Sequence, residues 1–184
     1  MAEYYLVAQL PSLDGISERM PLPITEERFF ELCDGALGKK AREELRNVTL
    51  LPEKSPGAPS SSPLLQAWTE NERKLRLALG KVRAEKLKKP FDTQNQPISG
   101  EYLKTAAAAL EMEDPMEAEQ FLSRFRLTFL ETLRPLDSFS EDFVFYYGLK
   151  LKLMKRIRQF DQEAGAAAYQ NIYNAIINED RSEA

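Results

Sequence analysis

The sequence predicts an all-α protein, a bundle of about six to seven helices. The long segments repeat apolar residues every three or four positions, as helices do, rather than alternating like strands. Glycine is scarce, with 8 residues in 184, while hydrophobic residues make up 43% of the chain. A chain of this length is expected to form one domain over residues 1–184 and to bury a hydrophobic core without needing disulfides or a structural metal.

Two regions of this chain are not assigned to long helices. In the N-terminal segment, 1–24, residues 4–10 are compatible with either a strand or a short helix. No partner strand is evident elsewhere, so the all-α interpretation is preferred. The run 52–63, PEKSPGAPSSSP, has four prolines and four serines and predicts a mobile loop.

Capping residues and prolines place the remaining helices. Thr25 is an expected N-cap, with Glu26 and Glu27 where negative charge suits the helix dipole. Pro63 and Pro115 suit first-turn positions. The expected helices cover about 25–37, 39–50, 63–88, 100–110, 115–133, 140–160 and 163–178.

The helix that begins at Ser140 has the strongest signals. Ser140 is the expected cap, and Phe139 and Val144 flank it as in a hydrophobic staple. Two neighbouring apolar stripes follow, which predict burial against more than one helix. These stripes are Tyr146, Leu149, Leu153, Ile157 and Phe160, and Val144, Tyr147, Leu151 and Met154.

Composition argues against most enzyme classes. The chain has no histidine, which removes the Ser-His, Cys-His and His-metal arrangements. Its one cysteine, Cys33, is expected to be a small buried hydrophobe, and Trp68 a core anchor. We therefore predict a protein that is not an enzyme, with no catalytic residue, cofactor site or metal ligand.

An acidic cluster lies around the start of the helix expected at Pro115. It consists of Glu111, Glu113, Asp114, Glu117 and Glu119. The cluster lacks the spacing of a calcium-binding loop, and the helix dipole accounts for Glu117 and Glu119. A metal-dependent or hydrolytic enzyme using these carboxylates is a minor alternative.

Charge is segregated along the chain although the total is only −4. Residues 64–89 carry a net charge of +5, 90–142 −7, 143–160 +5 and 161–184 −4. The first basic segment is either a solvated helix face or a surface that tracks phosphates, although it lacks interleaved aromatic residues. The second is either the basic outer face of an amphipathic helix or a docking surface for an acidic partner or an anionic membrane. The candidate partner-binding residues are Arg73, Arg76, Arg83, Lys86, Lys150, Lys152, Lys155 and Arg156.

The N-terminal residues and the overall charge limit the expected cellular location and partners. The first residues carry no basic n-region, and no apolar run approaches 18 residues, so a cytoplasmic protein without direct membrane insertion is expected. The pI near 5.2 argues against nucleic acid as a partner. A helical nucleic-acid-binding or general protein-interaction module using the basic helix 73–89 remains the alternative. The oligomeric state stays open.

Short segments along most of the chain carry a family resemblance. They are Tyr4 to Leu13, Pro23 to Thr25, Phe29 to Cys33, Trp68, Asn71 to Arg76, Leu79 to Leu87, Asp114 to Glu119, Phe143 to Leu151, Arg156 and Gly165. Together they resemble an uncharacterised bacterial family that is encoded beside V-type ATP synthase subunits.

Three pieces also resemble the C-type subunit of V/A-type ATPases, which is the d-type subunit in eukaryotes. They are the arginine-rich helix, the helix start Asp114 to Glu119, and the segment Tyr147 to Leu151. In those ATPases this component is an all-helical funnel between the central rotor shaft and the proteolipid ring. The resemblance implies a non-enzymatic component or assembly factor of a V-type ATP synthase. Its partners would be the central stalk and the proteolipid ring, at the inner face of the membrane.

Overall fold

The computed structural model describes residues 2–18, 20–50, 60–92 and 96–159, together with residues 170, 172 and 173. Within these residues the all-α prediction is confirmed, since the structure contains seven helices and no strand. The helices are α1 (Ala2–Gln9), α2 (Glu26–Ala36), α3 (Lys39–Asn47), α4 (Pro63–Lys86), α5 (Gly100–Glu111), α6 (Pro115–Thr132) and α7 (Glu141–Gln159).

The ambiguous N-terminal residues form the short helix α1. The helix predicted over 163–178 lies almost entirely outside the described residues, as do residues 52–59 of the predicted loop. Among the described residues, no helix has the length and apolar character needed to cross a membrane.

Side-chain oxygens cap the N-termini of α2 and α7 at the residues that the sequence predicts. Thr25 Oγ1 accepts a hydrogen bond from a backbone N–H in the first turn of α2 at 3.2 Å. Ser140 Oγ accepts one in the first turn of α7, also at 3.2 Å. Ser62 and Asp114 cap α4 and α6 in the same way, with a proline following each cap. These bonds satisfy N–H groups that a helix start leaves without partners.

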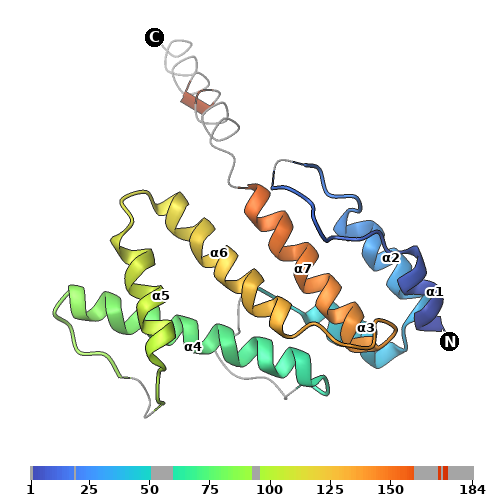
Figure 1. The fold of residues 1–184 in the computed structure, drawn as a ribbon, viewed down its shortest axis with the longest axis horizontal. Helices are drawn as coiled ribbons and strands as arrows, with labels where there is room; N and C mark the ends of the chain where they lie inside the picture. The colour runs from blue at the N-terminus through green and yellow to red at the C-terminus, as the bar shows by residue number, and fades with distance from the viewer. Residues whose placement is uncertain are drawn as a thin grey trace, which may run out of the picture.

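Helix α7 forms the centre of the larger hydrophobic core. It lies between α6 on one side and α2 on the other, and it also contacts α3 and α4 (Figure 1). All the predicted stripe residues from Val144 to Ile157 are buried, which confirms burial against several helices. Gly148 allows the close approach of α2, since a Cβ there would lie 3.1 Å from the Phe29 ring. Cys33 and Trp68 are buried in the same core, as predicted.

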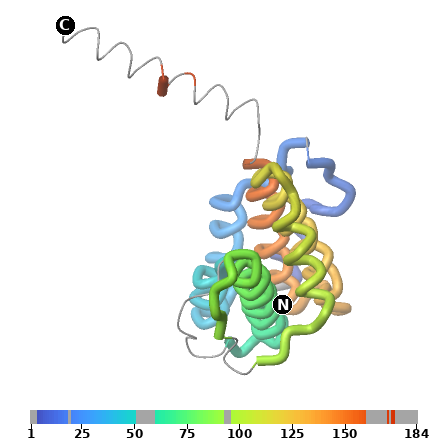
Figure 2. Tube along the Cα trace, turned by 90° about the vertical axis from the view of Figure 1, so that its left-hand side faces the viewer, coloured from blue at the N-terminus to red at the C-terminus, as the bar shows by residue number. Residues whose placement is uncertain are grey.

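A smaller core lies where α5 and α6 pack on α4, around Leu75, Ala109 and Leu122. Hydrogen bonds tie α5 to α4 at both of its ends. The Tyr102 hydroxyl donates to Asn71 at 2.7 Å, and Lys86 donates to the Leu110 carbonyl at 2.6 Å. Helix α5 therefore runs in the same direction as α4. Figure 2 views the molecule from the side of α4 and α5.

Candidate functional site

A chain of ion pairs joins α4, α6 and α7. Both carboxylate oxygens of Glu72 on α4 accept from Arg126 Nε on α6, at 2.9 and 3.1 Å. Arg126 Nη1 lies 3.6 Å from the Glu119 carboxylate, which accepts from Arg156 Nη2 on α7 at 2.6 Å. Burial raises the pKa of Glu72, and the neighbouring arginines, Arg126 foremost, act in the opposite direction. We call this set the Glu72–Arg156 chain.

Three of the four members of the Glu72–Arg156 chain come from parts of the sequence that carry the family resemblance, and Arg126 is the exception. Glu72 lies in the segment 71–76, Glu119 ends the segment 114–119, and Arg156 is a separate position. The structure therefore brings these separated parts together at one place between three helices. The arrangement links α4, α6 and α7, because the Glu72–Arg126 pair crosses the α4–α6 interface and the Glu119–Arg156 pair crosses the α6–α7 interface.

Sequence reasoning singled out Arg156 as a partner-binding residue and missed the other members as a site. A signal was present. Glu72 lies four residues after Trp68 and three before Leu75, inside the apolar stripe of α4. A charge in an apolar stripe must find a partner when the stripe is buried, because an unpaired buried charge is costly. The stripe pattern alone could not identify Arg126 as that partner.

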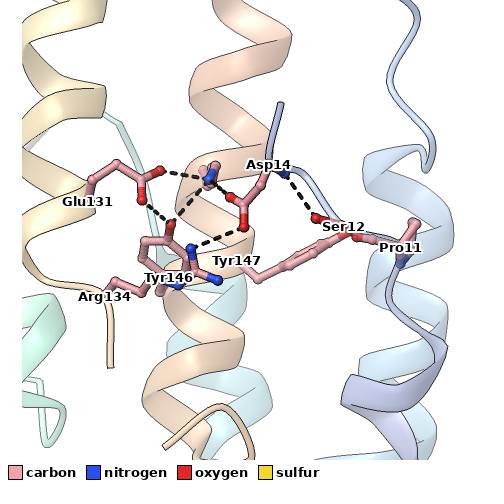
Figure 3. A network of polar contacts seen from close by, with 8 residues as sticks. Pro11, Ser12, Asp14, Glu131, Arg134, Tyr146 and Tyr147 are labelled. Carbon is pink, nitrogen blue, oxygen red and sulfur yellow. Dashed lines mark hydrogen bonds and ion pairs between the residues drawn. The ribbon is translucent and has the colours of Figure 1, made fainter. Parts of the chain in front are cut away.

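A second network surrounds Lys150 of α7, whose side chain is only 7% exposed. Its ammonium lies 2.5 Å from the Asp14 carboxylate and 2.7 Å from the Glu131 carboxylate. The Tyr146 hydroxyl donates to Glu131 at 2.7 Å, and Arg134 donates to Asp14 at 3.1 Å. Figure 3 shows Asp14 of the loop 10–25, Glu131 of α6, Arg134 just after α6 and Tyr146 of α7 converging on this point.

The network favours the charged forms of both acid and base. Burial by itself lowers the pKa of Lys150, but its hydrogen bonds to Asp14, Glu131 and Tyr146 outweigh burial and raise the pKa. The hydrogen bond from Lys150 lowers the pKa of Asp14, assisted by Arg134. Burial, with the hydrogen bond to Glu131, raises the pKa of Tyr146 to about 12. Lys150 thus keeps its proton near neutral pH and does not supply an amine nucleophile.

Further polar contacts fasten the N-terminal loop, residues 10–25, onto α6 and α7. The Tyr147 hydroxyl donates to the Pro11 carbonyl at 2.8 Å, and Arg124 pairs with Glu18 at 2.9 Å. Arg158 donates to two backbone carbonyls of the loop at 2.7 and 2.9 Å. Leu13 and Ile24 of the loop are buried in the larger core. The loop is therefore held by ionic contacts on its edges and by apolar burial beneath.

A hollow of about 360 Å³ lies beside the Lys150 network. Leu127 and Thr128 of α6, Met154 of α7 and the loop residue Ile16 contribute to its lining. Its ionic lining groups, Asp14, Glu131 and Lys150, already pair with one another. The network therefore acts as a clamp between the loop and two helices.

The predicted partner-binding residues of α7 all make contacts within the protein. Lys150 does not lie on an exposed basic face, since its side chain is buried in the network described above. Lys152 Nζ donates to the Val48 carbonyl at 2.5 Å, and Lys155 Nζ donates to Glu26 at 2.9 Å. Arg156 pairs with Glu119. The physical reason is the central position of α7, which is surrounded by acidic groups of other elements.

The predicted partner-binding residues of α4 are placed differently. Arg76 and Arg83 are exposed. Arg73 forms hydrogen bonds with both oxygens of Glu70, three residues earlier on the same helix. Lys86 is exposed, although its ammonium donates to a carbonyl at the end of α5. The structure therefore leaves the basic surface of α4 facing outward.

An aromatic ring that the sequence did not associate with α4 lies on this surface. The ring of Phe91, from the connection 87–99, packs on Gly80: a Cβ there would lie 2.7 Å from the ring. Gly80 is between Arg76 and Arg83 on the helix. The helix itself lacks interleaved aromatic residues, but the fold supplies one from outside. Spacing along the helix could not reveal it, because the connection folds back over α4.

The remaining sequence candidates have structural roles. Asp114 caps α6, and Glu119 belongs to the Glu72–Arg156 chain, so the acidic cluster is divided between helix capping and ion pairing. Burial, assisted by the Asp34 charge, raises the pKa of the Cys33 thiol to about 12, which disfavours the nucleophilic thiolate.

Comparison of the chain with protein-family models, with curated proteins and with solved structures finds no match in any of the three.

Proposed function

We propose that this protein is a non-enzymatic component or assembly factor of a V-type ATP synthase, acting as a coupler between the central stalk and the proteolipid ring in the manner of the C-type subunit. The assignment to this complex comes from the sequence resemblance. A coupler has to hold partner surfaces at fixed relative positions, and this requires helices that do not shift against one another.

The observation that carries the proposal is the Glu72–Arg156 chain. Glu72, Glu119 and Arg156 come from segments that carry the resemblance to the family encoded beside the ATPase. They form one set of ion pairs through Arg126, which lies outside those segments. Buried and half-buried pairs of this kind fix register between helices, because a lost partner leaves a charge uncompensated in the interior. Three of the four residues in this set therefore lie in segments that carry the resemblance, and the set links three helices, as a coupling body requires.

Partner contact in this proposal falls to the outward basic residues of α4. Arg76, Arg83 and Lys86 are exposed. Charges on an exposed rim govern encounter rate and register more than affinity. The cations of α7 instead hold the protein together.

Co-purification from the native organism tests the proposal. The chain carries an affinity tag at its chromosomal locus, membranes are solubilised in mild detergent at low salt, and the eluate is examined by mass spectrometry. We expect V-type ATP synthase subunits in amounts comparable to the tagged chain. A matched strain carries the same tag on an unrelated acidic cytoplasmic protein. Equal recovery of the ATPase in both strains, or no recovery, contradicts the proposal.

A further inference from the structure

One face of α4 gathers arginines around an aromatic ring. Arg73, Arg76, Gly80, Arg83 and Leu87 follow the three- and four-residue spacing that places side chains on one side of a helix. The Phe91 ring covers Gly80. We call Arg73, Arg76, Arg83, Leu87 and Phe91 the α4 arginine face.

Two lysines of α4, Lys74 and Lys81, have carboxylate neighbours on the same helix. Lys74 pairs with Glu70 at 3.5 Å, and Lys81 lies 3.9 Å from Glu85. The side chains of Arg76 and Arg83 make no ion pair or hydrogen bond within the described residues. The α4 arginine face therefore presents two guanidinium groups whose donors are available to a partner.

Apolar surface accompanies these two cations. Leu87 is 60% exposed and Phe91 40% exposed, both among the more exposed large hydrophobic residues described. Exposed apolar groups flanked by arginines are typical of protein interfaces, where aromatic residues and arginine are enriched. The combination points to a partner that carries both negative charge and an apolar side chain.

We propose that the α4 arginine face docks an acidic amphipathic helix of a partner protein. Arg76 and Arg83 are seven residues apart, which is about 10.5 Å along a helix. A partner helix with carboxylates seven residues apart places one carboxylate at each guanidinium, where paired hydrogen bonds can form. An apolar side chain midway between those carboxylates meets the Phe91 ring. The inference rests on the proposed partner-binding role of α4.

The charge distribution favours an acidic helix over a nucleic acid. The chain carries a net charge of −4, and Glu70 and Glu85 lie on α4 itself. A nucleic acid brings a continuous row of phosphates, which extends past Arg76 and Arg83 to parts of α4 where Arg73, Lys74 and Lys81 are already paired with Glu70 and Glu85. A helix with two matched carboxylates carries its charge only where the arginines are.

Site-specific photo-crosslinking tests the proposal in the native organism. A benzophenone amino acid replaces Ala84, which is half-buried beside Arg83, and in a control strain it replaces Lys40, which is exposed on α3. After irradiation, mass spectrometry identifies the crosslinked segment. We expect adducts from position 84 and not from position 40. They should lie on a segment with carboxylates seven residues apart and an apolar residue between them.

The second stage uses that segment as a synthetic labelled peptide. Fluorescence anisotropy measures its affinity for the purified full chain. We expect Arg76→Glu/Arg83→Glu to weaken binding about tenfold or more, and Phe91→Ala to weaken it severalfold. Lys39→Glu/Lys40→Glu changes the charge equally on exposed α3 residues and should leave affinity within twofold. Circular dichroism confirms that each variant is folded.

The outcomes separate this inference from the proposed function. Adducts to nucleic acid, to a segment without the carboxylate pair, or no adduct at position 84 overturn the docking proposal. Equal affinity for wild type and Arg76→Glu/Arg83→Glu also overturns it. Adducts on an acidic helix of a protein outside the V-type ATP synthase support the docking proposal and contradict the proposed function. Co-purified ATPase without an adduct at position 84 supports the proposed function and contradicts the docking proposal.

Discussion

The two basic segments of this protein carry the same net charge in sequence and use it in opposite ways. On α7, Lys150, Lys152 and Lys155 reach acidic side chains and carbonyls of other elements. On α4, Arg76 and Arg83 are exposed. The difference follows from position. Helix α7 is packed between α2, α3, α4 and α6, whereas α4 lies at one side of the molecule (Figure 1).

The net charge of a sequence segment therefore does not indicate whether its charged side chains are exposed to a partner or paired inside the fold. The acidic groups that neutralise α7 come from distant parts of the chain: Asp14 and Glu26 near the N-terminus, and Glu119 and Glu131 on α6. Charge segregation along the sequence becomes charge pairing in the fold. Only the charged side chains that remain exposed and unpaired in the fold are available to partners.

The largest expected effect concerns the buried ion pair. Arg126→Ala leaves the buried Glu72 carboxyl without the guanidinium that pairs with it, so the free energy of unfolding should fall by about 3–5 kcal/mol. Chemical denaturation measures it. Arg124→Ala, on the same helix, removes an exposed pair with Glu18 and should cost at most about 1 kcal/mol. Similar losses for both variants would contradict the distinction between inward and outward cations.

A double variant separates the ion pair from simple packing. Glu72→Leu/Arg126→Leu removes both charges and keeps apolar volume at the interface, so stability should recover most of the loss caused by Arg126→Ala. If the double variant is as unstable as the single one, the loss arises from packing rather than from an uncompensated charge.

Much of the fold could be predicted because it depends on local signals. Caps at Thr25 and Ser140 and the apolar stripes of α7 were readable along the chain, and the structure confirms them. The sites depend on contacts between distant residues. Asp14 and Lys150 are 136 positions apart, and the Phe91 ring reaches Gly80 through a connection that folds back. Periodicity within a segment carries no information about such pairs.

The next largest effect concerns the clamp at Lys150. Lys150→Met removes the cation that pairs with Asp14 and Glu131, and the free energy of unfolding should fall by about 1–3 kcal/mol. The loss is smaller than at Arg126 because both carboxylates are partly exposed and can be hydrated again. Hydrogen exchange should increase in the N-terminal loop more than in α5. Uniform acceleration throughout the chain would contradict a local clamp.

Acid should weaken the same clamp. The pKa of Asp14 is lowered in the folded protein by its hydrogen bond from Lys150. This stabilisation is fully present above the pKa of the unfolded chain, near 3.9, and is lost as the pH falls through the lower folded value. Asp14→Asn should therefore cost up to about 1 kcal/mol at pH 6.

Urea denaturation between pH 6 and pH 2.5 measures this dependence. The difference between wild type and Asp14→Asn should shrink toward low pH. Glu113→Gln is the matched control, because Glu113 is exposed and lies outside the Lys150 network. A difference between wild type and Asp14→Asn that does not change with pH would show that the ionised carboxylate is not what the loop needs.

The smallest effect is the one that defines the contrast between the two helices. Arg76→Glu/Arg83→Glu reverses two exposed charges, of which Arg76 also acts electrostatically on Glu72, and should lower the free energy of unfolding by less than about 1 kcal/mol. The same double reversal on α7, Lys152→Glu/Lys155→Glu, brings two carboxylates against Glu26 and should cost about 1–3 kcal/mol. Both variants change the net charge by the same amount, so a global charge effect cancels between them. Equal losses would mean that α4 also holds its arginines inside the fold, and a docking face there would have no physical basis.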